Sequence, residues 1–243
     1  MIKYILSLIF ISSVLVAQVN TESLRSSSKE LGFSHHTGVN LQVLEGNSRL
    51  TTLKANYRLD YLGDVYSSFL ITDIKYGHKS GSTYLNRGFV HARFLHPFKT
   101  QHVEFFSQRE YDDFVDLKSR FLIGSGLRFS FFKLSKNKIF MGFGAMWELD
   151  DVVGQKESSF IRSTNYITSV IDKDNYEFKF TAYYQPLFSN FSDVRALLQQ
   201  TLSVNLVKNV DFVTSLQYRY DSNPGNNIKP WDLELTNGFE VVF

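Results

Sequence analysis

Apolar and polar residues alternate along most of the chain, from about Ser34 to Phe243, in segments of roughly 10 to 14 residues separated by short polar breaks. Alternation with a period of two is typical of a β-strand that has one apolar and one polar face. Strands in soluble β-proteins average about five or six residues, whereas a tilted strand that crosses a bilayer needs about 9 to 11. The segment lengths therefore predict membrane-spanning strands.

The segment from Leu50 to Tyr61 illustrates the two faces. Its apolar face carries Leu53, Ala55, Tyr57, Leu59 and Tyr61, and its polar face carries Thr52, Lys54, Asn56, Arg58 and Asp60. Apolar side chains toward lipid and polar side chains toward a lumen are the pattern of a transmembrane barrel. Closure into a barrel also removes the free edges that so many long strands would otherwise present.

The alternating segments number about twelve, an even number as in bacterial outer-membrane barrels. They begin near Ser34, Arg49, Val65, Thr83, Thr100, Lys118, Asn137, Ser158, Asn175, Asp193, Asn209 and Asp232. Every second break is tight, and the other set contains the two longest, 151–157 and 222–231, which we expect outside the cell. The sequence thus predicts an all-β fold, a transmembrane antiparallel up-and-down β-barrel of about twelve strands.

The N-terminus has the features of a secretory signal peptide. Met1-Ile2-Lys3 is a short positive start, residues 4–16 form an apolar run too short for a comfortable transmembrane helix, and Ala17 offers a small residue for cleavage. We expect a signal peptide at residues 1–17, a periplasmic lead-in at 18–33 and the barrel at 34–243. An uncleaved anchor or a buried helix is the alternative. The arrangement predicts export to the outer membrane of a bacterial cell.

Composition and charge exclude several classes of function. The formal net charge is +2 and the basic residues are scattered, so the basic patch of a nucleic-acid binder is missing. The absence of cysteine excludes disulfides and thiolate metal sites. The six histidines show no helical pair with metal-binding spacing. We therefore expect no metal, no cofactor and no nucleic-acid partner.

The polar faces of the predicted strands are charged almost throughout. The expected lumen charge network comprises Lys54, Arg58, Asp73, Lys75, Arg87, Arg93, Glu104, Glu110, Arg120, Arg128, Glu148, Arg162, Glu177, Lys179, Arg195 and Arg219. If one hairpin turns about residues 113–117, Glu110 faces Arg120 and Asp112 faces Lys118 across the ladder as opposite-charge pairs. About twelve strands lies between a barrel filled by side chains and one with a water channel. The lumen is then either a narrow pore or a salt-bridged, plugged core.

Two stretches carry a family resemblance. The first is Glu30-Leu31-Gly32-Phe33-Ser34 with Gly46-Asn47-Ser48, leading into residues 51–58. The second is the acidic turn and basic strand start of residues 110–120, running into Gly124-Ser125-Gly126-Leu127-Arg128. These stretches resemble the salt-induced outer-membrane protein family, a bacterial domain of unknown function. The resemblance implies an outer-membrane barrel, and its label implies a link to salt or osmotic response, but it brings no accepted activity.

The C-terminus resembles the last-strand signal that outer-membrane barrels present to their assembly machinery. Phe239, Val241 and Phe243 alternate up to a terminal aromatic residue. The partners expected are therefore outer-membrane lipids and, during biogenesis, the barrel assembly machinery, with the mature protein a monomer.

The expected function is that of a non-enzymatic outer-membrane barrel, either a narrow channel or a structural envelope protein. A lipid-directed outer-membrane enzyme is one alternative, but the sequence has no Gly-x-Ser-x-Gly elbow, and we expect no catalytic residues. A surface adhesion module is another, disfavoured because the outward loops are short and offer little binding area.

Overall fold

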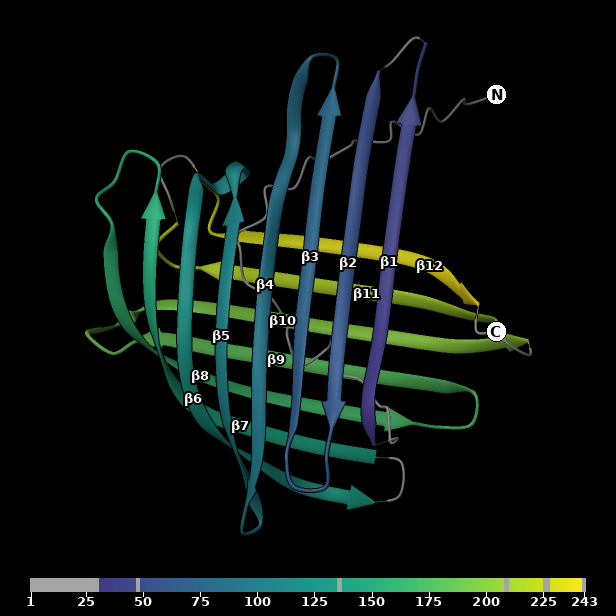
Figure 1. Ribbon diagram of the computed structural model, residues 1–243, viewed down its shortest axis with the longest axis vertical. Coiled ribbons are helices and arrows are strands. Elements are labelled where there is room, and N and C mark those ends of the chain that lie inside the picture. The colour runs from purple at the N-terminus through teal and green to yellow at the C-terminus, as the bar shows by residue number, and fades with distance from the viewer. Residues whose placement is uncertain (1–30, 47–48, 135–136, 208–209, 225–227, 242–243) are drawn as a thin grey trace, which may run out of the picture.

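The computed structural model describes residues 31–46, 49–134, 137–207, 210–224 and 228–241, which form twelve β-strands and one turn of 3-10 helix (Figure 1). The strands are β1 (Gly32–Leu44), β2 (Leu50–Leu62), β3 (Ser67–Lys79), β4 (Ser82–Phe98), β5 (Gln101–Asp112), β6 (Leu117–Leu134), β7 (Asn137–Val152), β8 (Ser158–Asp172), β9 (Tyr176–Leu187), β10 (Asn190–Val207), β11 (Val210–Asp221) and β12 (Trp231–Val241), and the helical turn is η1 (Asp113–Val115). The predicted number of strands is confirmed.

The described residues include only part of the predicted domain boundaries. The expected signal peptide, 1–17, and most of the lead-in lie outside the described residues, while β1 begins at Gly32, just inside the predicted lead-in. No helix in the described part of the chain is both long and apolar enough to span a membrane.

Each strand pairs in antiparallel fashion with its neighbours in sequence, so the twelve strands form one up-and-down sheet in the order β1 to β12. The sheet curls on itself: β1–β5 run along the long axis in Figure 1, and β8–β12 run across behind them. The predicted closure is not made within the described ranges, where no pairing joins β1 to β12. In the view of Figure 1 the two edge strands run in different directions, β1 along the long axis and β12 across it.

The register places one set of side chains inside the curled sheet. Small clusters of buried apolar residues lie there, one of Phe69, Ile71 and Leu95 and another of Tyr166, Tyr183 and Leu197. The opposite face is apolar and exposed, and its large side chains include Phe33, Val39, Leu41, Phe105, Ile123, Phe143, Trp147, Ile161, Tyr184, Leu233, Leu235 and Phe239. An exposed apolar face around a polar interior is the arrangement of a barrel in lipid, the reverse of a soluble β-sandwich.

Two glycines of β7 allow close approach on its inner face: Gly144 to the backbone of β6 and Gly142 to the ring of Tyr166 on β8. A Cβ atom added to Gly144 would lie 2.3 Å from the carbonyl oxygen of Ser125, and one added to Gly142 would lie 2.0 Å from the ring of Tyr166. Both distances are far below van der Waals contact. These positions therefore exclude any side chain, as expected where another backbone or a ring approaches.

We predict that Gly142→Ala lowers the free energy of unfolding by about 1–3 kcal/mol, because the new methyl group overlaps the Tyr166 ring in a packed interior. The matched control is Gly238→Ala on β12, where an added Cβ meets nothing within 4 Å. Urea titrations of the protein folded in lipid vesicles measure both effects. Equal unfolding midpoints for the two variants would contradict the close packing of Tyr166 on Gly142.

Candidate functional site

Inward-facing charges gather at one end of the sheet, where the ends of β5 to β8, β10 and β11 lie beside η1, the turn at 153–157 and the described loop residues 222–224 and 228–230. We call this group the arginine network; its members are Glu110, Arg120, Glu148, Asp150, Arg162, Asp193, Arg195 and Asp221. Glu148, at its centre, has a side chain with 0% exposure. Buried charges are tolerated only when they are paired and hydrogen-bonded, so the pairing of this group decides its properties.

Arg120 joins β6 to both of its neighbours. Its guanidinium donates two parallel hydrogen bonds to Asp150 of β7, from Nε to Oδ1 at 2.8 Å and from Nη2 to Oδ2 at 2.8 Å. Nη1 donates to Oε1 of Glu110 on β5 at 3.1 Å. Bidentate guanidinium–carboxylate pairs are among the strongest and most directional charge-assisted hydrogen bonds. Arg120 therefore fixes the relative positions of β5, β6 and β7.

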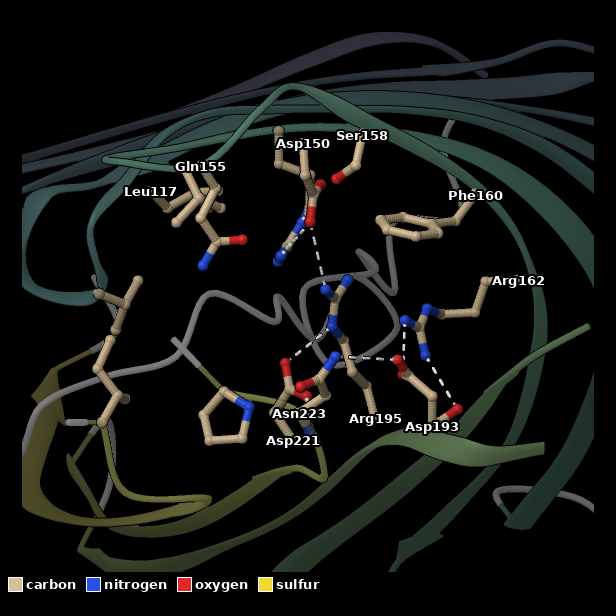
Figure 2. A pocket seen from close by; sticks show the side chains of 15 residues that line it. Leu117, Asp150, Gln155, Ser158, Phe160, Arg162, Asp193, Arg195, Asp221 and Asn223 are labelled. Atoms are coloured by element: carbon tan, nitrogen blue, oxygen red, sulfur yellow. Dashed lines mark hydrogen bonds and ion pairs between the residues drawn. The ribbon is translucent and has the colours of Figure 1, made fainter. Parts of the chain in front are cut away.

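Arg195 of β10 extends the network across the interior to strands that are not its neighbours. Its Nη1 donates to Oε1 of Glu148 at 2.6 Å and its Nη2 donates to Oδ2 of Asp150 at 3.3 Å, both on β7. The contact between Arg195 and Asp150 is drawn in Figure 2. Its Nε donates to Oδ2 of Asp221 on the adjacent strand β11 at 3.0 Å. Asp150 thus receives hydrogen bonds from both Arg120 and Arg195. The two arginines and Asp150 form a bridge across the lumen.

Arg162 of β8 closes the network on the side of β10. Its Nη2 donates to Oδ1 of Asp193 at 2.9 Å, and its Nη1 donates to the carbonyl oxygen of Gln185 at 2.9 Å. Its Nε lies 3.7 Å from Oε2 of Glu148, an ion pair without hydrogen-bond geometry. Three arginines therefore surround Glu148 from three strands.

A second cluster crosses the interior among β4, β5, β6 and β8. Tyr166 of β8 donates its hydroxyl to Oε2 of Glu104 on β5 at 2.9 Å and accepts from Nη1 of Arg128 at 3.0 Å. Nη1 of Arg93 donates to the same carboxylate oxygen at 3.4 Å. The guanidinium of Arg128 also lies 4.0 Å above the ring of Phe140. We call these residues the tyrosine cluster.

The remaining predicted lumen charges stay outside both clusters. Most pair within their own strand, Arg58 with Asp60 at 2.5 Å, Lys75 with Asp73 at 3.7 Å and Lys179 with Glu177 at 2.7 Å. Lys54 is exposed, and Arg87 and Arg219 are half-buried near one another. The predicted set therefore divides into five members of the arginine network, three members of the tyrosine cluster and eight peripheral charges.

One predicted charge pair is confirmed and the other is wrong. Glu110 lies directly opposite Arg120 in the ladder. Asp112 does not face Lys118, because a register shift after Glu110 puts Leu117 opposite Asp112. The Asp112 carboxylate instead accepts a hydrogen bond from the backbone N–H of Phe114 and caps η1, while Lys118 pairs with Asp151 at 3.4 Å.

The sequence reasoning missed three carboxylates of the network, Asp150, Asp193 and Asp221. The period of two along a strand, which sends every second residue to the same face, predicts the inward position of two of them. Asp150 is two residues after inward-facing Glu148, and Asp221 is two residues after inward-facing Arg219. Both residues lie near the end of a strand, where a polar turn follows. An alternating pattern read from the sequence is easily ended one or two residues too early at such a position.

Two cavities meet at the arginine network. The loop-side cavity has a volume of about 130 Å³, and the central cavity has a volume of about 40 Å³. Arg120 and Arg195 line both cavities, so these two side chains lie between them. Within the described ranges, no group of His, Asp and Glu side chains is arranged to hold a metal ion.

Comparison with known families decides the relationship of the chain. The family model described as "Protein of unknown function, DUF481" matches residues 38–243. The chain belongs to the DUF481 family. The description of this family names neither an activity nor a response to salt, so the salt label suggested by the sequence motifs is not carried by the match.

A solved structure of the NanC porin is similar to this DUF481 chain with a TM-score of 0.49 and 7% sequence identity, over 79% of this chain and 94% of that chain. A search of curated proteins finds no match to the sequence.

We predict that Arg120→Met lowers the free energy of unfolding of this DUF481 protein by about 3–5 kcal/mol, because it leaves Glu110 and Asp150 buried without their main cation. Lys118→Met on the same strand is the control, since its ion pair with Asp151 is exposed and such pairs contribute about 0–1 kcal/mol. Urea unfolding in lipid vesicles compares them. A similar decrease in the free energy of unfolding for both variants would show that the buried ion pairs of Arg120 stabilise the protein no more than the exposed pair of Lys118.

Proposed function

We propose that this DUF481 protein is a non-enzymatic β-barrel of the bacterial outer membrane whose lumen is obstructed by its own charged side chains. It would support the envelope or pass only ions and very small solutes. The observation that carries the proposal is the bridge of Arg120, Asp150 and Arg195 across the interior. The cavities on the two sides of this bridge are small, and the tyrosine cluster fills the interior further along the strands.

The strand lengths and the outward face support a membrane location. The strands have 11 to 18 residues, and a tilted strand that spans a bilayer needs about 9 to 11. Large apolar side chains cover the outer face of the sheet. Transfer of this face into lipid removes the exposed apolar surface from water, which is strongly favourable. The predicted signal peptide and C-terminal aromatic residues fit the same route, although residues 1–17 and Phe243 lie outside the described residues.

A membrane location requires that β1 and β12 pair, because each unsatisfied backbone N–H or C=O group in hydrocarbon costs several kcal/mol. Both edge strands turn their even-numbered residues inward. An antiparallel pairing of β1 with β12 must place inward residues opposite inward residues. Only one such register also pairs every residue of β12 with a residue of β1, and it places Val39 opposite Leu235. We propose that the barrel closes in this register or in the one shifted by two residues, which places Leu41 opposite Leu235.

The chain contains no cysteine, so the seam can be tested directly by disulfide cross-linking. We predict that Val39→Cys/Leu235→Cys or Leu41→Cys/Leu235→Cys oxidises readily in outer membranes, because opposed residues of paired strands lie within disulfide reach. Val39→Cys/Glu234→Cys is the control, with side chains on opposite faces. Cross-linking appears as a change in mobility on non-reducing gels. Failure of both seam pairs to cross-link would exclude closure in either register.

The arrangement of the network also favours a passive role over catalysis. Each inward carboxylate of the network is engaged by at least one arginine, as expected of groups that hold strands together. His91 forms a hydrogen bond of 3.0 Å with Gln108 and stacks between the rings of Phe69 and Phe106. We propose that the protein acts as a monomer, with outer-membrane lipids and the barrel assembly machinery as its partners.

We predict a wild-type channel of small conductance with weak ion selectivity, because bases and acids of the lumen are mixed and paired. Arg120→Ala/Arg195→Ala should raise the single-channel conductance several-fold, since these side chains lie between the two cavities. It should also make the channel cation-selective, because Glu110, Glu148, Asp150 and Asp221 remain.

Planar-bilayer recordings across a salt gradient measure both quantities, and heat-modifiable gel mobility verifies that each variant is folded. Arg120→Lys/Arg195→Lys is the control that retains positive charge. Large and strongly selective wild-type channels that the alanine substitutions leave unchanged would refute the proposed obstruction.

A further inference from the structure

The loop-side cavity has two chemically distinct sides (Figure 2). One side is aliphatic and is formed by Val115 and Leu117, which are buried, and by Val152 and Ile228, which pack against them. The other side is charged and consists of Arg120, Asp150, Arg162, Asp193, Arg195 and Asp221. The amides of Gln155 and Asn223 also line the cavity. A solute that enters this space therefore meets an apolar surface and a charged surface at the same time.

The charged side is balanced in sign. Three guanidinium groups and three carboxylates line it, so their formal charges cancel. A simple anion would gain from the arginines but be repelled by the aspartates, and a simple cation would meet the reverse. A solute with separate positive and negative groups can be attracted by both sets. The lining therefore offers partners of both signs, which suits a dipolar ion better than a simple anion or a simple cation.

Two neighbouring groups offer the most accessible charges of the network. The side chain of Asp193 is 15% exposed and that of Arg195 is 11% exposed, more than any other member. Oδ1 of Asp193 accepts from Arg162 at 2.9 Å, while its Oδ2 accepts a long hydrogen bond of 3.5 Å from Asn223. An ammonium group at Asp193 and a carboxylate at Arg195 would each gain a charge-assisted hydrogen bond.

The size of the cavity limits the solute. About 130 Å³ is room for roughly four water molecules at about 30 Å³ each, or for one compact molecule of similar volume. Displacing water from the aliphatic side by a hydrocarbon group is favourable. The solute is therefore small, and part of it is aliphatic.

We propose that the loop-side cavity binds a small aliphatic α-amino acid as its zwitterion. The ammonium group lies at Asp193, the carboxylate lies at Arg195, and the side chain packs on Val115, Val152 and Ile228. This site is separate from the question of conductance, because the cavity lies on the loop side of the Arg120 and Arg195 side chains. It can be occupied whether or not the lumen conducts.

Isothermal titration calorimetry of the full-length protein in detergent, with L-valine as the probe, tests the site. We expect saturable binding of L-valine. L-valinamide, which lacks the carboxylate, and N-acetyl-L-valine, which lacks the ammonium group, should bind at least ~10-fold more weakly. D-glucose of comparable size should give no saturable heat. Equal affinity for all four compounds, or saturable binding of glucose alone, would overturn the proposal.

Two variants examine the two sides of the cavity separately. Asp193→Asn removes the carboxylate proposed to hold the ammonium group, and Ile228→Ser removes apolar surface without touching any ion pair of the network. Each should weaken L-valine binding by ~10-fold or more. Lys156→Ala is the control, because Lys156 neighbours Gln155 in the same turn but does not line the cavity.

Folding of each variant is checked by heat-modifiable gel mobility, so that loss of binding is scored only on folded protein. If the folded Ile228→Ser variant binds L-valine with unchanged affinity, the amino acid does not pack on Ile228 and the proposed site is refuted. Absence of saturable L-valine binding to wild-type protein would also refute it, while leaving the conductance measurements to decide the proposed function.

Discussion

The rest of the structure depends on the separation of charged side chains from the exposed apolar face of the sheet. Alternation along the twelve strands, interrupted at a few register shifts, sends about every second side chain to the interior, and many of those side chains are charged. In so narrow a space a guanidinium must find a carboxylate, since an isolated buried charge costs several kcal/mol. The bridge through Arg120, Asp150 and Arg195 is the result, and the shapes of both cavities depend on it.

This constraint explains why the fold was largely predictable from sequence. A period of two over long segments indicates how many strands there are and which residues share a face of each strand. Tight turns between consecutive strands make them neighbours in the sheet, which gives an up-and-down order. The pairing of Glu110 with Arg120 was also predictable, because the two residues face each other across one hairpin. Local information was sufficient in each of these cases.

Other features depend on information that local alternation does not contain. The register shift in β5 and β6 moved Asp112 away from Lys118, and a bulge of this kind leaves no mark in a pattern of alternating residues. The contact between Tyr166 and Glu104 joins residues far apart in sequence and depends on how the whole sheet curls. The bonds from Arg195 to β7 arise in the same way. The sequence therefore indicated most of the charges and the pairing of Glu110 with Arg120, but not the partners that the other charges meet across the interior.

The uneven distribution of ion pairs has a mechanical consequence. Charges on β5 to β8, β10 and β11 are tied to other strands, whereas those on β2 and β3 pair along their own strand, as Arg58 does with Asp60 and Lys75 with Asp73. Pairs within one strand resist no sliding or spreading between strands. One wall of the sheet therefore has ion pairs that join different strands, while in the described part of the chain β2 and β3 are joined to their neighbours without them. In the membrane location proposed above, a change in bilayer thickness or lateral pressure would be absorbed mainly at β2 and β3.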